Sequence, residues 1–321
     1  MVWECYLTVF KAESPVHIGY RQIGILKTTR YYITGRAMWG AITANLTRVI
    51  YSKPTSREYQ IVGDFVKENI RTTYFYPAIN KNDVKDLVWS RHEVNSYLVF
   101  MPRYTEDGIK FGEKYREEFE QVFIHSFVST SIDKRKKSAE EDSLHEFEYI
   151  KNKIKIDNKI YDVYYIGYLF VRENVENNGI KIEKCEDTGF MVKNRNKGVD
   201  IRNVINTLWA GGERNYGFGK LTLNKIEKRN RIFGNLEFKI DVDDPIIKNL
   251  QVSISHLKLD RSFLMEFGEI EPLVGREWSD KGSGQKSSNA KICTVTGSVI
   301  RKGDFRIGYY GILDTCGKTE N

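Results

Sequence analysis

The sequence lacks the cysteine and histidine patterns that mark metal sites and disulfide-rich folds. Its four cysteines, Cys5, Cys185, Cys293 and Cys316, form no C-x-x-C pair. This argues against a zinc site or a disulfide framework and fits a reducing cytoplasm. None of the five histidines stands at metal-ligand spacing from another. We therefore expect a cytoplasmic protein with no bound metal and no other cofactor.

Long hydrophobic runs are also missing from the sequence, and its first residues do not predict a secretory leader. No stretch approaches ~18 uninterrupted apolar residues, so we expect no membrane span and no membrane partner. The opening MVWECYLTVFKAE carries an acidic residue and no basic n-region, so it predicts a strand rather than a signal peptide. Apolar residues make up 40% of the chain and charged residues 29%. This balance allows a packed core and disfavours disorder across the whole chain.

Positive charge outweighs negative charge, with a net charge of +7. An acidic partner such as a nucleic acid would explain this excess, although many basic proteins simply carry lysines on a solvated surface. The length of 321 residues fits one large domain or two ordinary ones.

Apolar periodicity predicts an alternating order of strands and helices. Residues 3–9 alternate apolar and polar side chains, which predicts a half-buried strand. Thr34 can cap a helix over 35–50, where apolar residues recur at helical spacing. The same patterns predict helices at 111–123 and 201–209, and strands at 163–171, 221–223, 236–242, 252–259 and 292–300. Residues 28–33 are predicted to form a short strand or an extended entry to the first helix.

Four segments have less regular patterns. Residues 127–150 have strand-like ends around a charged, Lys-rich middle, which predicts an extended hairpin. Residues 173–189 are polar and predict a surface loop, whereas 228–234 form a candidate linker. Residues 279–290 are rich in Gly, Ser and Lys and predict a mobile segment.

The most distinctive stretch is the glycine-rich run WAGGERNYGFGKL. It does not match a Walker A loop, because Gly219-Lys220 would require glycine at Arg214 and Ser or Thr at Leu221. The dinucleotide fingerprint G-x-G-x-x-G also fails, three residues after Gly219. The loop is expected to leave a helix and enter a strand, so no helix N-terminus faces a phosphate there. A nucleotide cofactor is therefore not expected at this loop.

What the loop offers instead is a permissive backbone with cations placed in it. Glycines allow positive φ angles and let another backbone approach closely. Arg214 and Lys220 can supply charge, and exposed amides can form an anion-binding concavity. Tyr216 and Phe218 offer stacking surfaces for unpaired bases. The alternative is a glycine-rich turn that binds nothing.

Three motifs, in order across most of the first 225 residues, resemble the CRISPR-associated RAMP superfamily (repeat-associated mysterious proteins). The first is SPVHIGYRQIG followed by YYITGRAMWGAI, and the second is the hairpin STSIDKRKKSAEEDSLHEFEYI. The third is the glycine-rich run, read as G-G-x-x-x-x-G-x-G-[KR]-L. About a hundred residues follow it and end in ICTVTGSVIRKGDFRIGYYGIL. This arrangement is similar to the type III effector subunits that cap the 5′ handle of the crRNA.

The resemblance implies an α+β fold with two ferredoxin-like (RRM-like) domains. Residues 1–228 would form the first, with the hairpin insertion and the glycine-rich loop, and residues 229–321 the second. The implied function is that of a non-catalytic RNA-binding subunit of a type III CRISPR effector ribonucleoprotein. It would hold the crRNA 5′ handle and link the guide filament to the large polymerase-like subunit. Its partners would be crRNA, guide-coating RAMP subunits, that large subunit and, indirectly, target RNA.

The residues implied to contact RNA lie in the first loop, near the start of the first helix, in the hairpin and in the glycine-rich loop. They are His17, Tyr20, Arg21, Arg36, Lys134, Arg135, Gly211, Gly212, Arg214, Asn215, Tyr216, Gly217, Phe218, Gly219 and Lys220. For Trp39, near the same helix start, we favour core packing over stacking on RNA.

Several alternatives stay open at this level. As a guide-coating subunit, the chain would cut target RNA with Mg²⁺ through Asp133, which could equally be a solvated charge. As a repeat-cleaving endoribonuclease, it would use His17 as general base, although a hydrogen-bonded structural histidine is the simpler interpretation. The cluster at 134–137 would contact phosphates or form a solvated turn, and the acidic residues 140–142 would repel RNA. In a pure scaffold, the basic surface would meet acidic protein.

Overall fold

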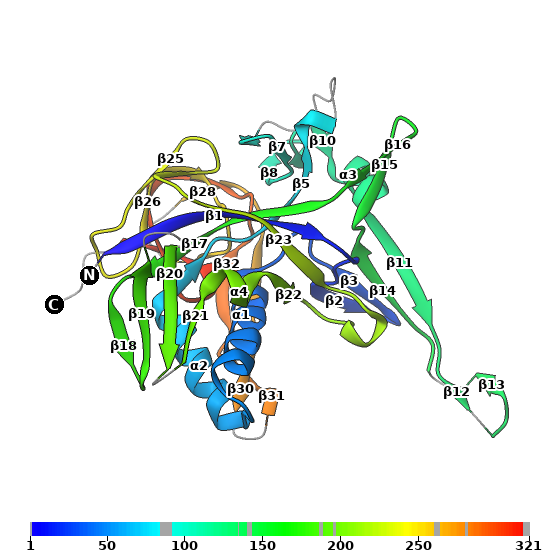
Figure 1. Cartoon of the computed structure of the whole chain (residues 1–321). Coiled ribbons are helices and arrows are strands. Elements are labelled where there is room, and N and C mark those ends of the chain that lie inside the picture. The colour runs from blue at the N-terminus through cyan, green and yellow to red at the C-terminus, as the bar shows by residue number, and fades with distance from the viewer. Residues whose placement is uncertain are drawn as a thin grey trace.

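Two large β-sheets form the body of the protein, and helices pack on one face of the first sheet (Figure 1). The computed structural model describes residues 2–83, 92–133, 135–139, 143–185, 189–194, 197–259, 264–279 and 282–316. None of the helices in this described part of the chain is long and apolar enough to cross a membrane.

The first sheet is built around strand β1 (Trp3–Ala12), which pairs antiparallel with β17 and β23. Its strand order is β22 (Thr207–Trp209), β23 (Lys220–Lys228), β1, β17 (Tyr164–Arg172), β5 (Tyr76–Asn80), β7 (Tyr97–Val99) and β6 (His92–Val94), with β4 (Ile70–Thr72) beside β17.

Both faces of β1 are buried, because alternate side chains of a strand point to opposite sides of its sheet. Tyr6 and Phe10 belong to the core under the helices. Leu7 and Val9 belong to a second core, which they share with the second sheet. The predicted strand at 3–9 is confirmed, but the expectation that it is half-buried was wrong, since even the polar member Thr8 is fully buried.

The helices on the first sheet are held by local capping and by apolar stripes. They are α1 (Gly35–Ile50), α2 (Ser56–Asn69) and α4 (Ile201–Ile205). The remaining helix, α3 (Arg116–Phe123), lies elsewhere and directly precedes the strand that begins at Ile124. The Thr34 hydroxyl accepts a hydrogen bond from the Ala37 amide at 3.3 Å, which confirms the predicted cap of α1. At α2 the Thr55 amide donates to the Glu58 carboxylate at 2.7 Å, as in a capping box.

The second sheet is formed by residues after 229 and packs on the free face of the first. Its order is β24 (Arg231–Ile232), β25 (Leu236–Lys239), β26 (Ile246–Val252), β33 (Val299–Ile307), β34 (Leu313–Thr315), β27 (Leu257–Lys258), β32 (Lys291–Thr294) and β29 (Ile270–Leu273), with β28 (Met265–Phe267) beside β33. Ile247 and Phe305 reach from it into the shared core. The domain boundary at residue 228 stays a prediction, and no described residue after Ile205 lies in an α-helix.

A long hairpin, here called the arm (residues 124–150), projects from the body (Figure 1). It consists of β11 (Ile124–Ser129) paired with β14 (His145–Ile150), with β12 (Ile132–Asp133) and β13 (Ser138–Ala139) toward its tip. At its base β14 pairs with β3 (Leu26–Thr29), which pairs with β2 (Gly19–Ile23). The predicted hairpin is confirmed.

The remaining strands form small sheets at the surface of the body. They are β8 (Pro102–Thr105), β9 (Gly108–Phe111), β10 (Lys114–Tyr115), β15 (Lys153–Ile156), β16 (Lys159–Asp162), β18 (Val175–Asn177), β19 (Ile180–Cys185), β20 (Gly189–Asn194), β21 (Lys197–Asp200), β30 (Arg276–Ser279) and β31 (Gly282–Ser287). Short 3₁₀ turns lie at η1 (Lys81–Asp83), η2 (Arg214–Tyr216) and η3 (Tyr309–Gly311).

Two helix predictions ran too far. The helix expected at 111–123 begins only at Arg116, because β9 and β10 occupy the preceding residues. The helix expected at 201–209 ends at Ile205, because Thr207 to Trp209 pair with β23. The glycine-rich loop therefore connects two paired strands rather than a helix and a strand.

Two loop predictions differ from the structure, and a third segment follows its prediction in part. The polar segment 173–189 contributes β18, β19 and the start of β20. Ile180 and Ile182, both in β19, are fully buried. Part of the expected mobile segment 279–290 lies in β31, which pairs with β30. Residues 28–33, expected as a short strand or an extended entry, begin within β3, which ends at Thr29, and Ile33 then forms an isolated bridge with Phe75.

A buried polar cluster joins the two sheets near the base of the arm. The Arg30 guanidinium lies 2.8 Å from the Glu271 carboxylate, which also accepts a hydrogen bond from the His256 ring. The Tyr74 hydroxyl lies 2.6 Å from the other ring nitrogen of His256. Burial alone would raise the pKa of Glu271, but the hydrogen bonds from His256 and Arg30 outweigh it and lower that pKa to about 2.

We expect Glu271→Gln to lower the free energy of unfolding at pH 7 by about 2 kcal/mol, because Arg30 would stay buried without its counter-charge. The lowered pKa of Glu271 stabilises the fold above a pH of about 4.5, and this contribution is lost as the pH falls toward 2. Urea unfolding at pH 7 and pH 3 should therefore show a smaller difference between variant and native protein at pH 3. The matched control is Glu237→Gln, whose exposed pair with Arg231 should contribute little. An equal difference at both pH values would contradict the prediction.

Candidate nucleic-acid interface

A cleft opens between the first loop (residues 17–20), α1, the start of the glycine-rich loop and residues 272–278, which run from the end of β29 in the second sheet into β30 of a small neighbouring sheet. Its volume is about 1160 Å³. Five arginines line it: Arg30, Arg36, Arg48, Arg214 and Arg276. Only two carboxylates, Glu213 and Glu277, stand among the described residues of its wall. The cleft is therefore an electropositive space built from segments far apart in the sequence.

One face of α1 forms the floor of the cleft. Arg36, Gly40, Ala44 and Arg48 all line it, and their four-residue spacing places them on a single helix face. A Cβ atom at Gly40 would meet nothing within 4 Å, so the floor is open between the two arginines. A chain of phosphates can thus approach the helix closely between two cations.

The glycine-rich loop (residues 211–220) is fixed to the first loop by main-chain contacts. Gly211 has a φ of +90°, and a Cβ there would lie 2.2 Å from the His17 carbonyl oxygen. The Gly212 amide donates to the same oxygen at 2.9 Å. Gly219, with a φ of +87°, approaches the Ala210 carbonyl equally closely. At Gly211 and Gly219, the close approach expected for RNA is made by the chain's own backbone.

The loop has two sides with different surroundings. Gly211, Gly212 and Arg214 face the cleft. On the other side Phe218 is only 7% exposed and packs against the rings of Phe147 and Tyr149, with centroids 5.2 and 5.1 Å away. This burial contradicts the expected stacking of Phe218 on bases.

The other residues expected in this loop are exposed but lie away from the cleft wall. Tyr216 is 44% exposed, and its hydroxyl lies 3.2 Å from the Ser129 hydroxyl of the arm. Asn215, Gly217 and Lys220 are exposed as well, and none of them lines the cleft. Their contacts with RNA stay predictions.

Arg48 and Arg214 are held in the cleft by hydrogen bonds to neutral oxygens. The Arg214 Nε donates to the Gly211 carbonyl at 3.2 Å, and the Arg48 Nε donates to the Tyr59 hydroxyl at 3.3 Å. Burial and the positive charge of Arg48 lower the pKa of Arg214. Within the described part of the chain neither forms an ion pair with a carboxylate. Two positioned guanidiniums without a counter-ion suit an anion that bridges them.

Arg30 and Arg36, by contrast, are already neutralised. Arg36 lies 3.1 Å from the Glu277 carboxylate and 3.8 Å from the centroid of the Tyr310 ring. Arg30 forms the buried pair with Glu271 described above. Trp39 is 8% exposed and its indole N–H donates to the Gly63 carbonyl at 2.8 Å, which fits the favoured packing role.

The first loop places its predicted residues differently from one another. His17 is 4% exposed and lines the cleft, and its Nδ1 lies 2.6 Å from the Glu148 carbonyl, which fits a hydrogen-bonded structural histidine. Its alternative role as general base stays a prediction. Tyr20 lines the cleft, with the Arg21 and Arg30 guanidiniums 4.6 and 4.4 Å from its ring centroid. Arg21 is exposed outside the cleft wall.

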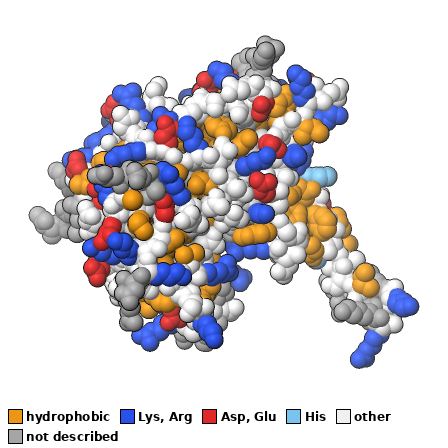
Figure 2. All heavy atoms as spheres, in the orientation of Figure 1, with side chains coloured by type: hydrophobic (Ala, Val, Ile, Leu, Met, Phe, Trp, Pro, Cys, Tyr) orange, Lys and Arg blue, Asp and Glu red, His pale blue; other side chains and the backbone are white. Residues whose placement is uncertain are grey.

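The arm carries the remaining candidates far from the cleft. Asp133 ends β12, and Lys134 lies outside the described residues. Arg135 is exposed near the tip, beside two further exposed cations, Lys136 and Lys137. Figure 2 shows Lys and Arg side chains at this tip and apolar ones along the arm. The proposed roles of Asp133 and Lys134 stay predictions.

Sequence reasoning identified Arg36 and Arg214 but missed the other three arginines of the cleft. Arg48 could have been found, because it repeats the Arg36 face of the same helix twelve residues later. Arg30 and Arg276 carry no such local signal. Arg30 reaches the cleft beside the first loop, where its amide donates to the Ile18 carbonyl, and Arg276 reaches it from β30.

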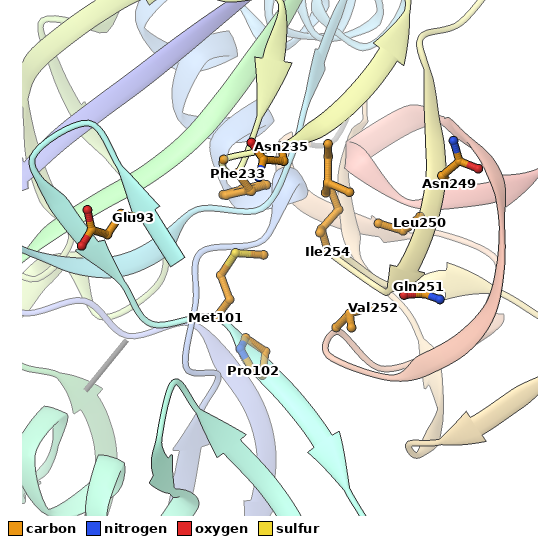
Figure 3. Close-up of a pocket in the computed structure, with 12 residues that line it drawn as sticks. Glu93, Met101, Pro102, Phe233, Asn235, Asn249, Leu250, Gln251, Val252 and Ile254 are labelled. Carbon is orange, nitrogen blue, oxygen red and sulfur yellow. The ribbon is translucent and has the colours of Figure 1, made fainter. Parts of the chain in front are cut away.

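Another cavity, of about 540 Å³, has a different character (Figure 3). Met101, Phe233, Leu250 and Ile254 are among its walls, and Glu93 is the only charged residue among the described ones that line it. It therefore offers an RNA backbone no cation. Among the described residues, no group of three or more His, Cys, Asp or Glu is arranged to hold a metal ion.

Comparison with known proteins points to one family. The family model described as the RAMP superfamily matches residues 9–222. No curated protein matches the chain. Among solved structures, a chain in the cryo-EM structure of the Type III-B Cmr-beta bound to cognate target RNA and AMPPnP is 11% identical, with a TM-score of 0.49; the match covers 92% of this chain and 86% of that one. For oligomeric Cmr4 from Pyrococcus furiosus the identity is 13% and the TM-score 0.29, over 70% of this chain and 100% of that one.

We expect Gly211→Ala to lower the free energy of unfolding by about 3 kcal/mol, from backbone strain and from the clash with the His17 carbonyl. The matched control is Gly217→Ala in the same loop. Gly217 also has a positive φ, of +82°, but a Cβ there meets nothing within 4 Å, so only the strain of about 1 kcal/mol applies. Urea unfolding of both variants measures the difference. Equal losses would show that the contact between the loops is unimportant.

Proposed function

The chain belongs to the RAMP superfamily, and from this premise we propose that it is a non-catalytic RNA-binding subunit of a type III CRISPR effector ribonucleoprotein. In this role it holds the crRNA 5′ handle and links the guide filament to the large polymerase-like subunit, in the cytoplasm. The observation that carries the proposal is the arginine-lined cleft between α1 and the glycine-rich loop.

The fold of the first 228 residues supports the proposed ferredoxin-like domain. The central strands lie in the order β23-β1-β17-β5, all antiparallel to their neighbours. α1 lies between β1 and β5 along the chain, and α4 lies between β17 and β23. This is the βαββαβ succession of a ferredoxin-like unit. For residues 229–321 the support ends at the sheet, since no α-helix lies among their described residues.

The chemistry of the cleft favours a single RNA strand. Arg48 and Arg214 can each bind a phosphate, and the open floor at Gly40 lets the backbone lie against α1. Tyr20 presents an aromatic ring in the same cleft, onto which an unpaired base can stack. Bases splayed from a single strand also expose the edges through which a handle sequence is read.

The arm supplies a second surface for the assembly. Phe127, Val128, Ile132 and Leu144 are 40%, 56%, 67% and 50% exposed, which is unusual for large apolar side chains in a monomer. With the cations at its tip, the arm suits a neighbouring RAMP subunit together with the guide–target duplex it coats. Cleavage of target RNA through Asp133 remains the alternative prediction, tested by comparing cut sites in native and Asp133→Ala complexes with Mg²⁺.

We predict that Arg48→Ala and Arg214→Ala each weaken binding of crRNA about tenfold at moderate salt, because each removes one phosphate contact. Each should also reduce the slope of log K against log salt concentration by about 1. Filter binding across a salt series measures both quantities. Lys53→Ala is the matched control, since Lys53 is an exposed cation beyond the end of α1 and outside the cleft wall. An unchanged affinity and slope in the double variant would refute the proposed site, and no affinity at low salt would favour a protein scaffold.

We also predict that Gly40→Glu abolishes crRNA binding, because it places a carboxylate on the open floor between Arg36 and Arg48. Gly40→Ala should leave binding intact and raise the free energy of unfolding by about 0.5–1 kcal/mol, since alanine favours a helix more than glycine. The same filter-binding assay, with urea unfolding, checks both variants. Full binding by Gly40→Glu would place the RNA elsewhere.

A further inference from the structure

A second charged cavity lies on the far side of turn η3 from the cleft. Its volume is about 270 Å³, and we call it the Tyr309 cavity. Ile312 lines both spaces. The two neighbouring tyrosines of the turn line different spaces: Tyr309 lines the small cavity, and Tyr310 lines the cleft. Tyr310 has a φ of +61°, a conformation costly for a tyrosine, and Gly311 follows at +71°. The strained turn thus directs one aromatic ring into each space.

The floor of the Tyr309 cavity is a row of charges across four adjacent strands. The strands lie in the order β33-β34-β27-β32. Arg306 stands directly opposite Asp314, and Leu257 pairs with Leu313, which puts Lys258 beside Asp314. Lys258 stands opposite Cys293, two residues from Lys291. All four charged residues therefore project from one face of the sheet.

The opposite wall comes from the first sheet and repeats an arrangement found in the cleft. The Arg71 side chain is 4% exposed, lies 2.7 Å from the Asp244 carboxylate and sits 4.5 Å from the centroid of the Tyr309 ring. In the cleft, Arg36 combines a carboxylate partner and the Tyr310 ring in the same way. Tyr309 is nevertheless 43% exposed, so part of its ring stays free for another flat group.

The cations of the cavity outnumber its carboxylates by four to two, with Arg71, Lys258, Lys291 and Arg306 facing Asp244 and Asp314. Asp314 is shared between Lys258 and Arg306 at 3.5 and 3.4 Å. No ion pair or hydrogen bond of the Lys291 ammonium occurs among the described residues. One shared carboxylate cannot neutralise two cations, so positive charge remains at the sheet end of the cavity.

We propose that the Tyr309 cavity binds a phosphate monoester that carries a flat base, either a free mononucleotide or the phosphorylated end of an RNA. Lys291 and Lys258 bind the phosphate, and the base stacks on the exposed part of the Tyr309 ring. The cavity lies just below the usual volume range of small-molecule sites, which favours one nucleotide over a strand. This site is separate from the RNA cleft and does not depend on the proposed function.

The test uses the purified full chain and equilibrium dialysis with AMP, adenosine and inorganic phosphate. We expect AMP to bind at least tenfold more tightly than adenosine, because the phosphate supplies the ionic contacts. Lys291→Ala and Tyr309→Ala should each weaken AMP binding about tenfold, whereas Tyr309→Phe should retain it. The matched control Lys302→Ala removes an exposed lysine of β33 outside the cavity and should change nothing.

A second arm separates the two sources of the phosphate. RNA with a terminal monophosphate is compared with the same RNA ending in a hydroxyl, with and without AMP as competitor. If the phosphorylated RNA binds more tightly than the hydroxyl-ended RNA, and Lys291→Ala abolishes that difference, the site binds an RNA end. If AMP binds but the two RNAs bind equally, the site binds a free nucleotide.

The proposal is overturned if native protein binds no AMP at millimolar concentration, or if Lys291→Ala and Lys302→Ala behave alike. It is also overturned if AMP binding disappears in Arg214→Ala, which would place AMP in the cleft. Loss or retention of crRNA binding in the Arg48 and Arg214 variants leaves this result untouched, so failure of the proposed function is recognised separately.

Discussion

Burial of β1 on both faces is the constraint on which the cleft depends. A strand whose two faces are both apolar needs a cover on each side, and here the helices cover one and the second sheet covers the other. With the second sheet docked, residues 272–278, at the end of β29 and in the β30 strand that follows, line the cleft together with α1. The Arg30–Glu271 pair and the His256 ring fix that docking with buried polar contacts. The RNA site proposed here is therefore a consequence of how the two sheets pack.

The carboxylates around the cleft divide four of its five arginines into two groups. Glu271 and Glu277 hold Arg30 and Arg36, so these side chains serve the packing of the two sheets. Arg48 and Arg214 are positioned by hydrogen bonds to neutral oxygens and keep their full charge for an external anion. The Tyr309 cavity shows the same division, since Asp244 holds Arg71 while Lys291 stays available. Charge that is positioned but not neutralised is the reason why both places are proposed as binding sites.

Much of the first half of the chain could be predicted from local patterns. Thr34 correctly predicted the start of α1, and the strand-like ends around the Lys-rich segment correctly predicted the arm. The errors arose where pairing partners lie far away in the sequence. Thr207 to Trp209 follow a helical pattern but pair with β23. The mostly polar residues 173–189 form strands, because the isoleucines among them are buried in the core. Tertiary pairing overrides local propensity in such short segments.

The sequence by itself determined the family motifs, the positions of the glycines and the periodicity that places Arg36 and Arg48 on one helix face, because these depend on residues close together in the chain. Only the tertiary structure decided that Phe218 is buried, that Gly211 admits the His17 carbonyl and that Arg276 reaches the cleft. Each of these depends on a contact between distant segments, and the free energy of such contacts comes from burial that no local pattern encodes.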